Sequence, residues 1–185
     1  MAWIKQINEN EATGKLKQVY DEILNTRGKI SNVMKIHSID VDSMKHHLDL
    51  YLSIIYSESN ISKEEKELIA VVVSSINNCS YCIHHHAEAL KNFWDDESKI
   101  NMLISDYKSI EFPIRVHAIL NYAEKLTVTP GLVNEYDVQN LRIHDLSDED
   151  ILNVNLIVSY FNFVSRIANG LGVETSEEEV KGYKY

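Results

Sequence analysis

The sequence predicts an all-α fold, and three observations lead to that prediction. Apolar residues recur at helical spacing along most of the 185-residue chain. Capping boxes, the sequence pattern that begins many helices, occur at Ser62 and again at Ser147. No segment shows the apolar–polar alternation of a half-buried strand. A chain of this length fits one domain, residues 1–185.

The first two predicted helices follow an extended amino-terminal arm. One begins near Lys15 and ends at Gly28, and the other is capped by Asp40. Residues 29–38 lie between them and are expected to form an irregular connection that buries apolar side chains. The second helix also carries two histidines that we expect at the surface, His46 and His47.

The middle of the chain predicts two helices joined by a sharp bend. The first starts after Ser62 and is apolar on nearly all sides over residues 68–76, which favours burial. The pair Asn77-Asn78 is unfavourable inside a helix and predicts a break. The second helix is expected to begin near Cys79, which places that residue at a helix amino terminus.

Further helices are predicted towards the carboxyl terminus. A short helix follows the acidic pair at residues 95–96, another begins at Pro113, and a third lies near Val138. A longer apolar helix then opens at Ser147. The last three of these make a C-terminal helical unit, residues 113–172.

The long helix is predicted to end at Gly170 or Gly172, and the polar residues 175–185 after it are expected to be loose. Residues 147–165 share scattered identities with residues 62–80 at a constant offset. This similarity is compatible with an internal duplication, although two buried helices can also share such residues by chance.

Charge and hydropathy exclude several classes of protein. The net charge of −10 argues against binding nucleic acid or an anionic membrane surface, which attract clustered Lys and Arg. No secretory signal opens the sequence, and the longest apolar run, residues 68–76, is about half the ~20 residues of a membrane-spanning helix. We therefore expect a cytoplasmic protein, in which two cysteines remain reduced unless they are catalytic or bind metal.

Both cysteines lie in the core motif, residues 61–92. Cys79 and Cys82 are three residues apart, so they share one helix face and can close a disulfide. The thiolate is the reactive form of cysteine, and the partial positive charge of a helix amino terminus favours it. We therefore expect Cys82 to titrate below the ~8.5 of a free thiol. A dithiol in this position therefore indicates redox chemistry.

The predicted bend also brings an acid and a base together. Folding back at Asn77-Asn78 places Glu67 ~15 Å and His86 ~12 Å from the bend, so the two side chains come level. His86 lies four residues after Cys82, on the same helix face. The hairpin therefore predicts a Glu67–His86 pair in which the imidazole acts as a base on Cys82, directly or through water.

The spacing of these residues resembles that of a known family. Glu67, Cys79, Tyr81, Cys82 and His86 read as E-x11-C-x-Y-C-x3-H, which is similar to the AhpD-like alkylhydroperoxidases of the carboxymuconolactone decarboxylase superfamily, in particular its peroxidase-related branch. Weaker matches occur at His37-Ser38, at Lys125 to Pro130, and at Asn162, Phe163 and Arg166.

The resemblance implies an all-helical subunit that assembles into dimers, trimers or hexamers. It also implies that Cys82 attacks a hydroperoxide to form a sulfenic acid, that Cys79 condenses with it to a disulfide, and that Glu67 and His86 relay protons. Family members often carry histidine where this chain has Tyr81, which is expected either to pack or to form a hydrogen bond in the site.

The sequence thus predicts a thiol-dependent peroxidase that needs no haem, flavin or metal. A disulfide reductant of the lipoyl or thioredoxin type would regenerate it. The alternative is a disulfide reductase or redox sensor on the same scaffold. A decarboxylase or lactone enzyme is disfavoured because such relatives lack the cysteine pair.

A zinc site is the remaining alternative for the cysteine pair. Cys79 and Cys82 could supply two ligands, and the histidines after them the others. Helical spacing, however, points His84 and His85 away from His86. We therefore expect no metal here, with His84 and His85 at the surface or in an interface.

Overall fold

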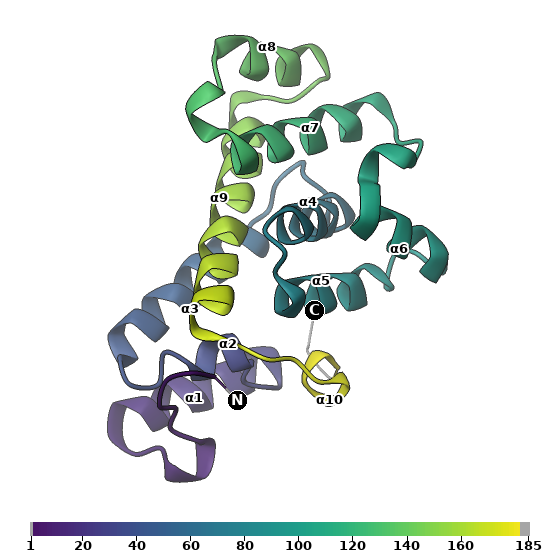
Figure 1. The fold of residues 1–185 in the computed structure, drawn as a ribbon. Coiled ribbons are helices and arrows are strands. Elements are labelled where there is room, and N and C mark those ends of the chain that lie inside the picture. Colours follow the sequence, from purple (N-terminus) through teal and green to yellow (C-terminus); the bar gives the residue numbers. More distant parts are fainter. Residues whose placement is uncertain (1, 182–185) are drawn as a thin grey trace.

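Helix α4 (Lys63–Ile76) lies at the centre of the fold, with other helices around it (Figure 1). It packs against α5 (Ser80–Leu90), α7 (Ile114–Val128) and α9 (Asp148–Leu171). The computed structural model describes residues 2–181, and that part of the chain contains helices and no strand. Enclosure on several sides explains why every side chain in the apolar run over residues 68–73 is at most 2% exposed.

The amino-terminal third forms a smaller apolar cluster of its own. Helix α1 (Gly14–Arg27) packs against α3 (Val41–Ile55), and Asp40 caps α3 by accepting a hydrogen bond from the Ser43 amide, as the sequence predicted. The connection between the two helices was predicted to be irregular but contains a four-residue helix, α2 (Asn32–Lys35). The apolar side chains of this cluster include Leu16, Val19, Tyr20, Ile23, Met44 and Leu48.

One histidine prediction on α3 is wrong. His46 is exposed, but the neighbouring His47 is only 4% exposed. Its helix position faces α9, where Tyr160 provides a hydrogen-bond partner for the ring. A buried imidazole needs such a partner, and this one comes from a segment more than a hundred residues away.

Two further helices pack around this central group. Helix α6 (Glu97–Asp106) packs against α4 and α5, and α8 (Glu135–Ile143) packs against α7 and α9 (Figure 1). Pro113 precedes the first residue of α7, as its fixed φ favours.

Helix α9 runs without interruption through the residues that correspond to the Asn77-Asn78 bend in the weak repeat. Asn162 takes the place of Asn77 in that comparison, and the side-chain amide of Asn77 donates a 3.0 Å hydrogen bond to the Asn162 side-chain oxygen. The later segment therefore remains one helix where the earlier segment folds into a hairpin.

Helix α9 is long and apolar enough to span a membrane by length and composition alone. Its most apolar window is 44% buried inside the protein, however, against α4, α7 and α3. The core helix of a globular domain has the same composition, so this feature is weak evidence for a membrane span.

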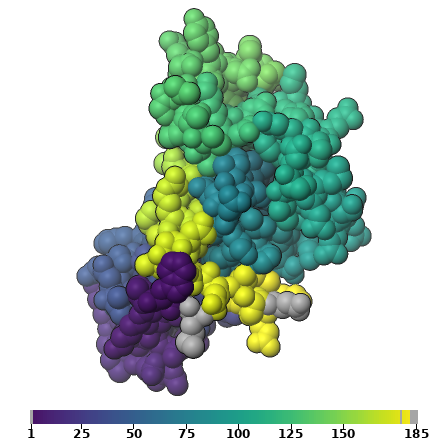
Figure 2. All heavy atoms as spheres, viewed as in Figure 1, coloured from purple at the N-terminus to yellow at the C-terminus, as the bar shows by residue number. Residues whose placement is uncertain are grey.

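The carboxyl-terminal segment is not loose as far as the structure describes it. A short helix, α10 (Glu177–Val180), packs against α5, and Lys29 donates hydrogen bonds to the carbonyls of Glu178 and Glu179. The amino-terminal arm lies beside the same segment (Figure 2), with the Trp3 amide bonded to the Leu171 carbonyl at 2.9 Å. Residues 182–185 of the predicted loose tail lie outside the described residues.

Replacement of Gly172 by alanine should destabilise the protein. Gly172 ends α9 at φ +63°, and an added Cβ would overlap the Trp3 ring. A left-handed conformation costs an L-residue ~1–2 kcal/mol, so the free energy of unfolding in urea should fall by about that amount.

Gly170→Ala is the matched control, because nothing lies within 4 Å of its added Cβ. Alanine favours a helix over glycine by ~0.5–1 kcal/mol, so this variant should be slightly more stable than the original chain. Equal effects of the two substitutions would contradict the assignment of strain to Gly172.

Candidate functional site

The site begins at the bend between α4 and α5. Asn78 adopts the left-handed conformation at φ +50°, which asparagine tolerates better than most residues. The Asn77 side chain donates to the Val73 carbonyl at 2.9 Å, and the Cys79 amide donates to the Ser74 carbonyl at 2.9 Å. These bonds end α4 and turn the chain back, so α5 lies alongside α4 as the sequence predicted.

The two cysteines lie at the first turn of α5. Cys79 is the N-cap, and its sulfur accepts a 3.3 Å hydrogen bond from the Cys82 amide. The Cys79 and Cys82 sulfurs lie 2.6 Å apart, and the Ser165 hydroxyl of α9 lies 3.8 Å from the Cys82 sulfur. Both cysteines are free and almost fully buried, at 0% and 2% exposure. The thiols are therefore close enough to form a disulfide with little movement.

The acidic member of the pair differs from the prediction. The hydrogen bond from Cys82 lowers the pKa of Cys79 to about 7, and the Cys82 backbone amide, Ser165 and His86 add to that effect against the cost of burial. The pKa of Cys82 is raised, because its thiol is the donor to Cys79 and because it is buried. At neutral pH about half of the Cys79 thiols are therefore ionised, and the thiolate of the pair forms on Cys79 rather than on Cys82.

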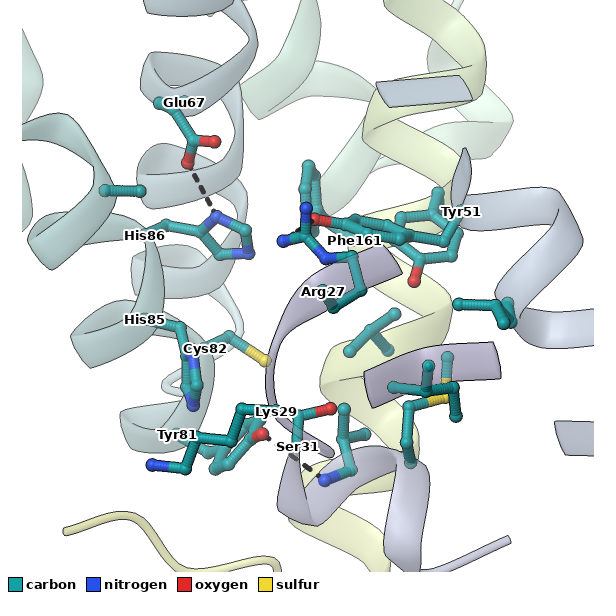
Figure 3. A pocket seen from close by; sticks show the side chains of 17 residues that line it. Arg27, Lys29, Ser31, Tyr51, Glu67, Tyr81, Cys82, His85, His86 and Phe161 are labelled. Carbon is teal, nitrogen blue, oxygen red and sulfur yellow. Dashed lines mark hydrogen bonds and ion pairs between the residues drawn. The ribbon is translucent and has the colours of Figure 1, made fainter. Parts of the chain in front are cut away.

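Glu67 and His86 form the predicted pair. The His86 Nδ1 lies 2.7 Å from a Glu67 carboxylate oxygen, and the edge of its ring packs on Phe161 at a centroid distance of 4.4 Å (Figure 3). Among the described residues, no hydrogen bond joins His86 to Cys82. A carboxylate partner at Nδ1 leaves Nε2 of the neutral ring as an acceptor, so His86 is suited to act as a base in the pocket through water or substrate.

A small pocket of about 100 Å³ lies in front of these residues. Cys82 lines the pocket and Cys79 does not, and Figure 3 shows the Cys82 sulfur pointing into it from α5. Arg27 and Tyr51 lie on the opposite wall, where the Arg27 guanidinium donates a 3.2 Å hydrogen bond to the Tyr51 hydroxyl. The wall is otherwise mostly apolar and aromatic.

Tyr81 forms a hydrogen bond at the base of the pocket. Its hydroxyl donates to Glu179 of α10 at 3.0 Å and accepts from the Val33 amide at 3.3 Å. Glu179 also pairs with His85 and accepts a 3.0 Å bond from the Asn32 amide. Burial raises the pKa of this carboxyl, but the bonds from His85, Asn32 and Tyr81 together hold it below its usual value.

Glu179 and His85 were missed as site residues. His85 was expected at a surface or interface, but it lines the pocket and its carboxylate partner lies 94 residues further along the chain. His85 and Glu179 meet only because α10 packs against α5 and buries the Glu179 carboxylate. No local spacing in the sequence indicates this contact. His84, in contrast, is exposed as expected.

A second missed group is a chain of buried rings behind the pocket. His47 Nδ1 lies 3.1 Å from His37 Nε2, and His47 Nε2 lies 2.9 Å from the hydroxyl of Tyr160, which lines the pocket. Burial, followed by the effect of His37, lowers the pKa of His47 to about 4, so both bonds involve a neutral ring at neutral pH. The resemblance of His37 to a family position was the one signal in the sequence.

The zinc alternative lacks its ligands. No group of three or more His, Cys, Asp or Glu side chains within residues 2–181 is arranged to hold a metal ion. His85 is paired with Glu179 and His86 with Glu67, so the histidines do not gather around the cysteines.

Comparison with known proteins gives a consistent family. A model of the Carboxymuconolactone decarboxylase family matches residues 42–125. An uncharacterized peroxidase-related protein from Silicibacter sp. TM1040 is 29% identical, with a TM-score of 0.81, and the match covers 89% of this chain and 86% of that one. An uncharacterized peroxidase-related protein with an alkylhydroperoxidase AhpD core, from Ralstonia eutropha JMP134, is 23% identical with a TM-score of 0.86, covering 99% and 98% of the two chains.

The same fold occurs in a debrominase. A cysteine-to-alanine variant of the debrominase Bmp8, in complex with 2,3,4-tribromopyrrole, is 17% identical with a TM-score of 0.77, covering 96% of this chain and 97% of that one. At this identity the likeness concerns the fold alone.

Titration of the thiols should reveal one acidic group, at Cys79. We expect ultraviolet thiolate absorbance to rise with pH around a midpoint of about 7, because the thiolate forms above the pKa of Cys79. Cys82→Ser keeps a hydroxyl donor towards Cys79 and should retain this transition. Cys79→Ser should lose it, and retention of a neutral midpoint in that variant would place the acidic thiol on Cys82 instead.

Proposed function

We propose that the chain, which is similar to the AhpD-like members of the carboxymuconolactone decarboxylase superfamily, is a thiol-dependent peroxidase. It would reduce hydroperoxides through a Cys79–Cys82 disulfide cycle. The observation that carries the proposal is the pocket that presents the Cys82 sulfur beside a histidine oriented by a carboxylate. A nucleophile, a base and a residue that orients the base are the components of such catalysis.

The cycle begins with the transfer of the Cys82 proton, to the Cys79 sulfur 2.6 Å away or to His86. The Cys82 thiolate then attacks the outer oxygen of the hydroperoxide. A sulfur–oxygen bond forms, the oxygen–oxygen bond breaks, and an alkoxide leaves as Cys82 becomes a sulfenic acid. Cys79 attacks the sulfenic sulfur next, which forms the disulfide and releases water.

The proton balance of this cycle sets a requirement on the site. In its ionised form the pair holds one thiol and one thiolate. Together with one hydroperoxide and one proton, these give one disulfide, one alcohol and one water. The site must therefore deliver one proton to the leaving oxygen in each turnover.

The burial of the sulfurs favours a small substrate. The pocket volume of about 100 Å³ is below the ~300–1,000 Å³ of pockets that hold drug-sized ligands. A hydroperoxide can enter such a pocket, whereas a disulfide on a protein surface cannot reach sulfurs at 0% and 2% exposure. These observations favour a peroxidase over a protein-disulfide reductase.

The same argument applies to the reductant. A slender dithiol such as a lipoyl group fits the narrow access better than a thioredoxin-type protein does. Assembly into a homo-oligomer is proposed on the family resemblance, and the cytoplasmic location expected from the sequence is proposed as well. No nucleic acid, membrane or metal partner is proposed.

Reductive debromination is a second candidate. It is supported by the shared fold with Bmp8 and by the aromatic side chains of the pocket wall, Tyr51, Tyr160 and Phe161. The dithiol would supply two electrons and two protons, so that a carbon–bromine bond becomes carbon–hydrogen, hydrogen bromide is released and the cysteines form a disulfide. Bromide release from tribromopyrrole, compared with hydroperoxide consumption by the same preparation, separates the two activities.

Substitution of each cysteine should have a distinct effect on hydroperoxide consumption with dihydrolipoamide or thioredoxin as donor. Cys82→Ser should abolish turnover, because it removes the sulfur that faces the pocket. Cys79→Ser should form about one equivalent of sulfenic acid, trapped by dimedone, and then stop, because no thiol remains to resolve it. Unchanged turnover in Cys82→Ser would contradict its role as the nucleophile.

His86→Asn should lower the rate of hydroperoxide reduction by about 10²-fold, the lower end of the range for a lost acid–base group. His84→Asn is the matched control, since His84 lies on the same helix but is exposed and outside the pocket. We expect it to retain the original rate. Equal rates in the two variants would remove His86 from the proton relay.

A further inference from the structure

A continuous chain of hydrogen bonds leads from the start of α3 to the Cys82 pocket. The Ser43 hydroxyl oxygen lies 3.1 Å from His37 Nδ1, and His37 Nε2 lies 3.1 Å from His47 Nδ1. His47 Nε2 lies 2.9 Å from the Tyr160 hydroxyl. The outer members, Ser43 and His37, are half-buried, while His47 and Tyr160 are buried. The chain therefore runs from near solvent to the interior.

The inner end of this chain is in the pocket. Tyr160 lines the pocket with Cys82, Tyr51 and Arg27. The next residue of α9, Phe161, packs against the ring of His86. Tyr160 and the Glu67–His86 pair thus line the same small pocket.

The chain of hydrogen bonds can exist in two polarities on the same heavy atoms. In one, Ser43 donates to His37, His37 to His47 and His47 to Tyr160, so the Tyr160 hydroxyl keeps its own proton for another acceptor. In the other, every donor and acceptor is exchanged, and Ser43 donates to the Asp40 carbonyl at 3.0 Å. Conversion of the first polarity to the second moves one proton into the pocket.

The proposed peroxidase cycle requires one such proton for the leaving alkoxide. His86 does not supply it as a neutral ring, because its Nδ1–H is donated to Glu67 and its Nε2 is an acceptor. If His86 takes up the Cys82 proton, that proton is needed for the water released when the disulfide forms. Arg27 can stabilise negative charge, but a guanidinium does not give up a proton in a protein. The Tyr160 hydroxyl can, since an alkoxide is a stronger base than a phenolate.

We propose that Tyr160 is a catalytic residue that donates a proton to the leaving oxygen of the hydroperoxide, with His47 and His37 as the positioning residues that hold it and restore its proton. This inference rests on the proposed peroxidase function. As the oxygen–oxygen bond breaks, Tyr160 protonates the alkoxide, His47 Nε2 returns a proton to the phenolate, and the hops continue through His37 to Ser43. Water replaces the Ser43 proton.

Leaving groups of different basicity test this role. An alkyl hydroperoxide expels a strongly basic alkoxide, whereas a peracid expels a weakly basic carboxylate that needs no proton donor. Single-turnover oxidation of the reduced full-length protein would be measured with cumene hydroperoxide and with peracetic acid. Alkylation by iodoacetamide reports thiol reactivity without an oxygen leaving group.

Tyr160→Phe should slow oxidation by cumene hydroperoxide about 10²-fold, while oxidation by peracetic acid and alkylation stay within about twofold of the original rates. His47→Gln should show the same dependence on leaving group with a smaller loss. Tyr122→Phe is the matched control, because it also removes a buried hydroxyl that accepts a hydrogen bond, from Asn155 at 2.8 Å, but lies outside the pocket. It should leave all three rates unchanged.

Equal slowing of Tyr160→Phe with both oxidants, or no slowing with either, would overturn the role of Tyr160. An unchanged His47→Gln would overturn the positioning role of the histidines. These outcomes differ from failure of the proposed function, in which the original chain itself would react with neither oxidant. Circular dichroism of each variant identifies a loss of folding, which would also slow the peracid reaction.

Discussion

The left-handed bend at Asn77-Asn78 is the constraint on which the rest of the site depends. Only residues 77–79 separate α4 from α5, so the amino terminus of α5 meets the end of α4 rather than extending it. Cys79 then caps α5, and Glu67 on one helix comes level with His86 on the other. Without this reversal the carboxylate and the imidazole would lie on opposite ends of a long rod.

The parts of the site set by local sequence could be predicted, and those set by distant docking could not. The capping residues, the asparagine pair and the four-residue spacing from Cys82 to His86 act within one or two helical turns, so they are visible in the sequence. Glu179 and Tyr160 reach the site from elements more than 75 residues away from it. The polar character of the tail and the histidines of α3 suggested exposure, because their buried partners carry no sequence pattern of their own.

The assignment of the acidic thiol failed for a related reason. Sequence reasoning gave the helix terminus as the source of acidity but not which sulfur would receive its hydrogen bonds. Because Cys79 occupies the N-cap, its sulfur accepts a hydrogen bond from the Cys82 amide and lies 2.6 Å from the Cys82 sulfur. Cys82 is buried in a low-dielectric environment, which disfavours its thiolate. The more acidic thiol is thus the one outside the pocket, next to the one that lines it.

Helix α9 links these features into one unit. Asn162 bonds to the bend, Ser165 contacts the Cys82 sulfur, Phe161 packs on His86, and Tyr160 joins the buried histidines of the amino-terminal cluster. These residues lie within two turns of one uninterrupted helix, so their relative positions are fixed by helix geometry. Because α9 has no bend, one straight helix contacts the Asn77-Asn78 bend, the thiols and the base in a single register. A second hairpin could not do this.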